Sequence, residues 1–542
     1  MFSVRISRYT GLLGAVALAV AGYLGGALPH ADLRSTVPGI LGYPRTAGAV
    51  VLYAAGVGLL SWAWLRLAGP ARLGRAGSPA RPGWEGLSVR WVLVTAGLWA
   101  LPLLLAPPLA SRDAYAYACQ GATYAAGHSP YAEGVAALPC PWVDTVSFIW
   151  RDTPAPYGPG FVVLAGAAAA LAGGSLLAAL GWLRLIALAG ALLIAWRAPA
   201  LARACGTDPG RALWLGLAAP LVGIHLVSGA HNDGLMIGLV VAALAAATRA
   251  RPGWRGVLVV GALLGLALAI KVTAVVVLPF AALLLAGPLR DPATTEAGTP
   301  AEAATPAGDE PGGRVQSRIG APVGRVLGFG VGLAGVSAVV LWFVSLATTL
   351  GFGWVDGLVS SGDSRQWTSL PTGVGFAIDY LFLPAGHTAV PVTRALGIGV
   401  LGIVLVALFV RTAGWGGLPW GARQGRGAER PGPAGPRRTD PATPRRVVAA
   451  AGWALGCTVL LAPVFHPWYA LWPLTLLAVA DWRRWLGWVA TGLAFLILPD
   501  GFNLARVTKL PGALLMAALA GVLLWRVLRT AVGTRVGLLR NR

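Results

Sequence analysis

Residues 325–350 read RVLGFGVGLAGVSAVVLWFVSLATTL, and Arg325 is the only charged side chain among them. A run of about 20 apolar residues is long enough to cross a bilayer as a helix. Only a helix or a closed barrel satisfies its own backbone hydrogen bonds in lipid, so this run predicts a transmembrane α-helix. Similar runs recur on both sides of it, near 9–28, 47–68, 90–109, 159–179, 182–203, 210–228, 233–248, 255–270, 272–287, 392–411, 447–465, 468–480, 484–499 and 511–530.

The composition of the whole chain agrees with this pattern. Of its 542 residues, 56% are hydrophobic and 11% are charged, whereas about 25% of residues are charged in an average soluble protein. These values exclude a disordered protein, a coiled coil and an ordinary cytosolic enzyme. We therefore expect an all-α fold, a polytopic transmembrane bundle of about 13–15 helices, the shortest of them buried inside it.

The formal net charge of +22 has two possible explanations. A strongly basic chain can bind nucleic acid, or its arginines can mark the cytoplasmic loops of a membrane protein. The arginines cluster in 69–89, 249–255, 412–446 and the tail after 525. Placing these on the cytoplasmic face accounts for the charge, so we expect a lipid bilayer and no nucleic acid as partner. Both termini are then cytoplasmic.

The same topology places the segments 29–46, 110–158, 351–391 and 500–510 outside the cell membrane. All six histidines fall on this outer side or at outer helix ends, so the outer face is the expected working face. The arginines after 196 stay inside only if the helix after Pro159 is re-entrant or partly immersed. The run 9–28 is longer than the apolar part of a signal peptide, so we expect no cleavable signal.

Two segments, 288–324 and 412–446, lack apolar periodicity and are rich in Pro, Gly and Ala, which predicts flexible cytoplasmic linkers. They divide the chain into membrane regions 1–287, 325–411 and 447–542. The outer segment 110–158 is rich in aromatic residues, so we expect it to be ordered, with short amphipathic helices. It contains Cys119 and Cys140, for which a disulfide and two free thiols are both compatible with the spacing.

The first candidate catalytic residue is Asp113, which directly follows a predicted span. A carboxylate at the membrane–water boundary is well placed as a general base for a hydroxyl acceptor. Helical spacing puts Tyr117 and Gln120 near the same face. The alternative is that Asp113 caps a helix and pairs with Arg112.

Two further polar motifs lie at outer helix ends. Tyr157 belongs to Pro154–Gly160, which either lines a site or is only a rigid joint before the next helix. His231, Asn232 and Asp233 are consecutive polar residues at the edge of the bundle, where they are costly unless used or paired. Asp233 or Asn232 could cap the following helix while His231 faces a cavity. A metal site formed with His225 would need more ligands.

Lys271 and the segment 465–469 complete the candidates. Lys271 is one of only two lysines; it either snorkels to the interface or binds an anionic phosphate. His466 and Trp468 either belong to an interfacial aromatic belt or line a sugar or phosphate pocket. Residues 364–371, SRQWTSLP, pose the same question more weakly.

Several of these motifs together resemble a known family. SRDAYAYACQG (111–121), GHSPY (127–131), PYGPG (156–160), PLVGIHLVSGAHNDGLMIGL (220–239), AIKVTAVVVLPF (269–280) and HPWYALWPL (466–474) are similar to the actinobacterial polyprenol-phosphate-mannose-dependent α-1,6-mannosyltransferases. These are integral-membrane glycosyltransferases of the GT-C class. The resemblance covers residues from about 90 to 480 and rests on the order of the motifs.

The resemblance implies a polyprenyl-phosphate-mannose donor, a mannan-type glycan or glycolipid acceptor, and a catalytic aspartate that matches Asp113. Inversion by a single displacement would give an α-1,6 linkage. Such a step needs one base and a stabilised phosphate leaving group, so we expect no metal or other cofactor.

Two other functions remain open on the sequence alone. One is a polytopic transporter or flippase of lipid-linked sugars, which should show internal repeats and helices broken at the midplane. The other is a GT-C transferase of another lipid-linked sugar, such as arabinose.

Overall fold

The computed structural model describes residues 2–29, 44–67, 87–287, 323–362, 364–384, 386–415 and 443–539. Within these ranges the chain is helical and contains no β-strand; an isolated bridge joins Ile497 and Asn503. The predicted all-α fold is confirmed.

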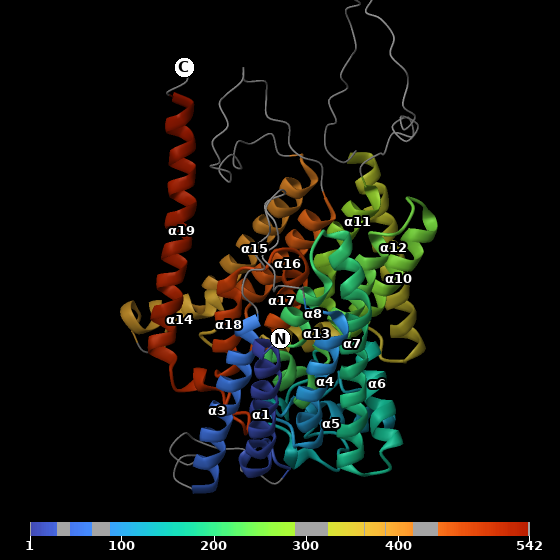
Figure 1. The fold of residues 1–542 in the computed structure, drawn as a ribbon, viewed down its shortest axis with the longest axis vertical. Helices are drawn as coiled ribbons and strands as arrows, with labels where there is room; N and C mark the ends of the chain where they lie inside the picture. The colour runs from blue at the N-terminus through green and yellow to red at the C-terminus, as the bar shows by residue number, and fades with distance from the viewer. Residues whose placement is uncertain are drawn as a thin grey trace, which may run out of the picture.

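Six of the described helices are long and apolar enough to cross a membrane. They are α1 (Phe2–Gly25), α3 (Pro44–Leu67), α7 (Leu176–Ala204), α12 (Val323–Ala347), α15 (Val390–Ala413) and α19 (Lys509–Leu539). In the most apolar window of α15 only 6% of residues are buried, and in that of α19 only 11%. Such exposed apolar surface suits lipid contact, and α19 projects away from the other helices in Figure 1. The chain is a multi-pass membrane protein.

Shorter apolar segments pack between these helices. They are α4 (Val89–Leu105), α6 (Pro159–Leu171), α9 (Asp233–Ala247), α10 (Trp254–Ile270), the 3₁₀ helix η4 (Val272–Val277) with α11 (Leu278–Ala286), α14 (Leu370–Phe382), and η6 (Pro467–Ala470) with α17 (Leu471–Ala480). Every residue of α17 is buried. With 13 residues, α6 is only about 20 Å long, which suits the partial immersion expected for it.

Two expectations about helices were wrong. The run 210–228 is not one helix, because α8 (Pro209–Leu217) and the π-helix η3 (Val222–Ser228) meet at 69°. Pro220 lies at the break, where it can donate no backbone hydrogen bond. In addition, the segment 351–391 is not only a loop, since it contains α13 (Trp354–Ser361) and the apolar α14.

The expected linkers lie largely outside the described residues, which end at 287 and resume at 323, and end at 415 and resume at 443. Their predicted boundaries were a few residues too wide. The helix α12 already begins at Val323, α15 continues to Ala413, and α16 (Pro444–Leu461) begins before residue 447.

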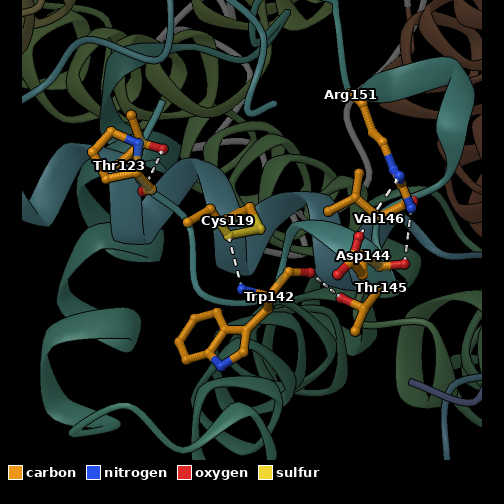
Figure 2. Close-up of a disulfide and its surroundings, with 9 residues drawn as sticks. Cys119, Thr123, Trp142, Asp144, Thr145, Val146 and Arg151 are labelled. Atoms are coloured by element: carbon orange, nitrogen blue, oxygen red, sulfur yellow. Dashed lines mark hydrogen bonds and ion pairs between the residues drawn. A yellow bond between two sulfur atoms is a disulfide. The ribbon is translucent and has the colours of Figure 1, made fainter. Parts of the chain in front are cut away.

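The segment 110–158 is ordered, as predicted. It contains α5 (Asp113–Ala125), η1 (Val143–Thr145) and η2 (Phe148–Trp150). A disulfide joins Cys119 of α5 to Cys140, and Arg151 donates hydrogen bonds to the carbonyl oxygens of Asp144 and Val146 (Figure 2). The helix α5 lies in the half of the bundle opposite the free end of α19 (Figure 1). The disulfide ties the middle of α5 to the loop that follows it, and the Arg151 hydrogen bonds close that loop on itself.

Candidate active site

Asp113 is the first residue of α5 and is buried, with 6% of its surface exposed. The residues before it are fixed by hydrogen bonds from other parts of the chain. The backbone N–H of Leu109 donates to Ser228 Oγ over 3.1 Å, and that of Ala110 donates to the carbonyl oxygen of Pro499 over 3.0 Å. The backbone N–H of Asp113 donates to Ser111 Oγ. The backbone at the start of α5, from which the Asp113 side chain projects, is therefore fixed.

Arg112 does not pair with Asp113 in the described part of the chain. Its guanidinium donates to the carbonyl oxygens of Leu28 and Thr145, over 3.1 and 3.2 Å. The alternative ion pair is thus not formed, and these contacts instead tie the start of α5 to the segment after α1 and to η1. The side chains of Arg112 and Asp113 do not pair because consecutive residues at the start of a helix point in different directions.

A histidine from a different motif faces Asp113. His231 Nδ1 lies 3.8 Å from Asp113 Oδ2 and 3.3 Å from the hydroxyl oxygen of Tyr117. His231 itself is fully buried and stacks on Trp468 at 4.1 Å between ring centroids, and Trp468 stacks on His466 at 4.6 Å. Motifs near 113, 231 and 466 therefore form one cluster.

Lys271 and Asp233 form a buried ion pair. Lys271 Nζ lies 2.8 Å from Asp233 Oδ1, which also accepts a hydrogen bond of 2.6 Å from Trp472 Nε1. The ammonium group lies 4.4 Å from the centre of the Tyr469 ring and 5.8 Å from that of Tyr157, within the range of cation–π attraction. Lys271 therefore does not snorkel.

The cap proposed for the start of α9 is not formed. Asn232 occupies the N-cap position with helical backbone angles and makes no side-chain cap bond. Asp233 instead directs its carboxylate toward Lys271 and Trp472. The side-chain nitrogen and oxygen of Asn232 are buried without a protein partner within the described residues.

The motif around Tyr157 joins the loop tightly to the end of α10. The backbone N–H of Gly158 donates to the carbonyl oxygen of Ile270 over 3.1 Å. A Cβ atom at Gly158 would lie 2.3 Å from the carbonyl oxygen of Ala269, so only glycine fits here. The rigid joint before α6 consequently holds Tyr157 beside Lys271.

Two cavities meet at Asp113. The larger encloses about 900 Å³, open solvent at its mouth included, and its walls combine Lys271 and Gln120 with mainly apolar and aromatic side chains. The other, which we call the polar cavity, encloses about 660 Å³ and contains Arg112, Gln366, Asp500, Asn503 and Arg506. Both are lined by Asp113, Trp150, His466 and Trp468. The carboxylate lies at the boundary between two chemically different spaces.

The surroundings of Asp113 suit a base that works near neutral pH. Burial raises the pKa of Asp113 to about 7; the positive charge of Lys271 opposes this shift, and the negative charge of Asp233 adds to it. A base whose pKa lies near the working pH combines a large ionised fraction with useful basicity.

Several residues of the site could not be found as site residues in the sequence. Trp472 lies in the motif 466–474 and Asp500 in the segment 500–510, but no local pattern distinguished either residue from its neighbours. Arg184, inside α7, donates to the carbonyl oxygens of Leu104, Ala106 and Ser228, over 2.8, 2.6 and 3.3 Å. It joins the end of α4 to the end of η3. A charged residue in the middle of an apolar helix was the available signal.

No three His, Cys, Asp or Glu side chains of the described ranges gather in a way that could hold a metal ion. The metal site considered for His225 therefore finds no further ligands among these residues, and His225 packs against the rings of His231 and Trp468.

The chain is similar to known proteins along most of its length. A profile of the alpha-(1->6)-mannopyranosyltransferase N-terminal domain matches residues 8–287, and one of the MptB C-terminal domain matches residues 442–529. Alpha-(1->6)-mannopyranosyltransferase A of Mycobacterium tuberculosis is 31% identical over 91% of this chain and 84% of its own length. Alpha-(1->6)-mannopyranosyltransferase B of Corynebacterium glutamicum is 28% identical over 92% of this chain and 77% of its own length.

No solved structure matches the chain significantly. The first profile covers more than half of the chain, and the relatives cover most of it. The chain is a membrane glycosyltransferase that uses a sugar donor and a glycan acceptor, and it belongs to the alpha-(1->6)-mannopyranosyltransferase family.

Proposed function

We propose that this enzyme transfers mannose from a polyprenyl-phosphate-mannose donor to a hydroxyl group of a mannan-type glycan or glycolipid, on the outer face of the membrane. The observation that carries the proposal is the position of Asp113 between the two cavities. A lipid-linked donor needs an apolar wall and a cation for its phosphate, and the larger cavity offers both through residues such as Val459 and Lys271.

The reaction follows from this arrangement as a single displacement. The carboxylate of Asp113 accepts the proton of the attacking hydroxyl while the new bond forms at the anomeric carbon. The bond from that carbon to the phosphate oxygen breaks, and its electron pair leaves with the polyprenyl phosphate. Attack opposite the leaving group converts a β-linked donor into an α-linked product. Lys271 would stabilise the released phosphate electrostatically.

Three side chains would support Asp113. His231 lies 3.8 Å from the carboxylate and is itself in contact with the Tyr117 hydroxyl, and Gln120, about two turns along α5 from Asp113, borders the larger cavity. His466 and Trp468 form the wall shared by both cavities, so they would contact the mannose being transferred. Tyr157 would border the donor next to Lys271.

A transport function has one observation in its favour. The broken pair α8 and η3, with His225 buried in η3, is the kind of interrupted helix found in transporters. The bend nevertheless brings Ser228 at the end of η3 into contact with the segment before Asp113, where its Oγ accepts a hydrogen bond from Leu109 N–H. This contact and the family membership favour transfer over transport.

The direct test is an assay of the purified protein with labelled polyprenyl-phosphate-mannose and a short α-1,6-linked mannoside. We expect a product longer by one mannose, with an α-1,6 linkage. Absence of product with this donor, together with transfer from another lipid-linked sugar such as an arabinose donor, would contradict the proposed donor. Movement of the intact donor across a bilayer without transfer would support the transporter.

A further inference from the structure

The polar cavity is assembled from segments that are far apart in the sequence. Its floor is the segment before α5, and one wall is a tight turn between residues 497 and 506. Backbone hydrogen bonds fix this turn: Leu498 N–H donates to Phe502 over 2.8 Å, and Leu504 N–H donates to Leu496 over 2.9 Å. The contact from Ala110 to Pro499 then fixes the turn relative to Asp113. The cavity is thus a built part of the site.

The side chains in this wall offer hydrogen-bond donors and acceptors side by side. Asn503 Nδ2 donates to Gln366 Oε1 over 2.9 Å, so the amide nitrogen of Gln366 is the end that a ligand can use. Arg506 lies over the Phe148 ring at 5.1 Å, which holds its guanidinium in a defined position. Asp500 is fixed by accepting a hydrogen bond from the backbone N–H of Phe502 over 3.0 Å.

The charges in the wall favour a neutral ligand rich in hydroxyl groups over a phosphate. Burial lowers the pKa of Arg112, and the negative charge of nearby Asp500 partly offsets this. A phosphate in the cavity would meet the Asp500 carboxylate, and like charges at short range repel. A hydroxyl both donates and accepts, so it can satisfy Asp500, Gln366 and an arginine at once. The aromatic rings of Trp150 and Phe502 offer flat apolar surface beside these groups.

The position of the polar cavity determines which substrate group it would hold. Asp113 is reached from the polar cavity and from the larger cavity, and both share Trp150, His466 and Trp468. In a single displacement the attacking hydroxyl must approach opposite the leaving phosphate, and therefore from the side away from Lys271. The polar cavity is the space on that side.

We propose that the polar cavity binds the terminal sugar of the acceptor, a mannoside, through Asp500, Gln366 and Arg506, and presents its hydroxyl to Asp113. This inference rests on the proposed function, because it names the second substrate of the same reaction.

The test uses two substitutions that keep side-chain size, Asp500→Asn and Gln366→Met. In the full-length enzyme each should raise KM for an α-1,6-linked mannobioside about tenfold and leave KM for the lipid-linked donor within about twofold. Lys271→Met should instead raise KM for the lipid-linked donor and leave KM for the mannobioside nearly unchanged. The exposed Asp144 gives the matched control, since Asp144→Asn removes a carboxylate that lines neither cavity. A rise in the donor KM of Asp500→Asn and Gln366→Met, with an unchanged acceptor KM, would overturn the inference.

A binding measurement separates this inference from the proposed function. Saturation-transfer NMR with the mannobioside and the purified enzyme needs no donor. Binding to the parent that weakens about tenfold in Asp500→Asn and Gln366→Met supports the inference even if the mannose donor proves wrong. Equal binding to the parent and to both variants, checked for equal thermal stability, overturns the inference while leaving mannose transfer intact.

Discussion

Lys271 Nζ and Asp233 Oδ1 lie 2.8 Å apart in the interior of the bundle, although the two residues belong to separate motifs. The Asp233 side chain is fully buried and that of Lys271 is 9% exposed. Removing either charge would leave the other buried without its partner. The pair therefore has a structural role and also fixes the ammonium group at the wall of the larger cavity.

Because the two charges are paired, removing both should cost less stability than removing one. Lys271→Met and Asp233→Asn should each lower the free energy of unfolding by about 3–5 kcal/mol, because each change leaves a buried group without its partner. The double variant should regain most of this stability without regaining donor affinity. Thermal unfolding in detergent and donor KM measure the two effects. Lys509→Met, at the only other lysine and on an exposed position, is the control.

Loss of the base should affect the rate alone. Asp113→Asn keeps the size of the side chain and removes the proton acceptor, so turnover should fall by about 10²–10⁴-fold. Donor binding and expression should persist. Asp144→Asn should stay within a few-fold of the parent, because its side chain is 95% exposed and lines neither cavity. Similar turnover in the two variants would remove Asp113 from this role.

The pKa of Asp113 predicts a pH profile. Burial raises this pKa to about 7, so below pH 7 the carboxyl group is protonated and cannot accept the hydroxyl proton. Turnover should fall about tenfold per pH unit below 7 and level off above it. Since the charge of Lys271 lowers this pKa, Lys271→Met should move the midpoint to higher pH. A midpoint that moves to lower pH would contradict the assignment.

The disulfide should stabilise the segment that carries Asp113. Cys119 and Cys140 are separated by 21 positions in the sequence. Closing a loop of this length lowers the conformational entropy of the unfolded chain, which stabilises the fold by about 3 kcal/mol. Cys119→Ser with Cys140→Ser should lower the unfolding midpoint and the turnover together. Cys457→Ser, at a cysteine that forms no disulfide, should change neither.

The arginine distribution predicts the orientation in the membrane. His128, exposed in the segment 110–158, should lie outside, and Arg251, exposed between α9 and α10, should lie inside. In a background without other accessible thiols, His128→Cys should react with an impermeant reagent in intact cells, and Arg251→Cys only after permeabilisation. The reverse pattern would invert the topology and place Asp113 on the cytoplasmic side.

The sequence by itself determined the all-α membrane fold, since charge is scarce and apolar runs of about 20 residues match a membrane-crossing helix, whereas a strand of a closed barrel needs only about 9–11 residues. It also indicated the polar motifs near 113, 157, 231, 271 and 466, because polar groups at helix ends are costly unless they are used. The break at Pro220 and the helix α14 were missed, because Pro220 follows an otherwise continuous apolar pattern and α14 is only 13 residues long.

Only the tertiary structure decided which of these motifs act on one another. Spacing along α5 relates Asp113 to Tyr117, but no local pattern relates Asp113 to His231, or Lys271 to Asp233 and Trp472. The same holds for Asp500 and Gln366, because no local pattern relates the turn 497–506 to the weak candidate segment 364–371 or to the start of α5, which all line the polar cavity. Contacts between distant segments depend on how the helices pack, and short-range periodicity carries no information about that packing.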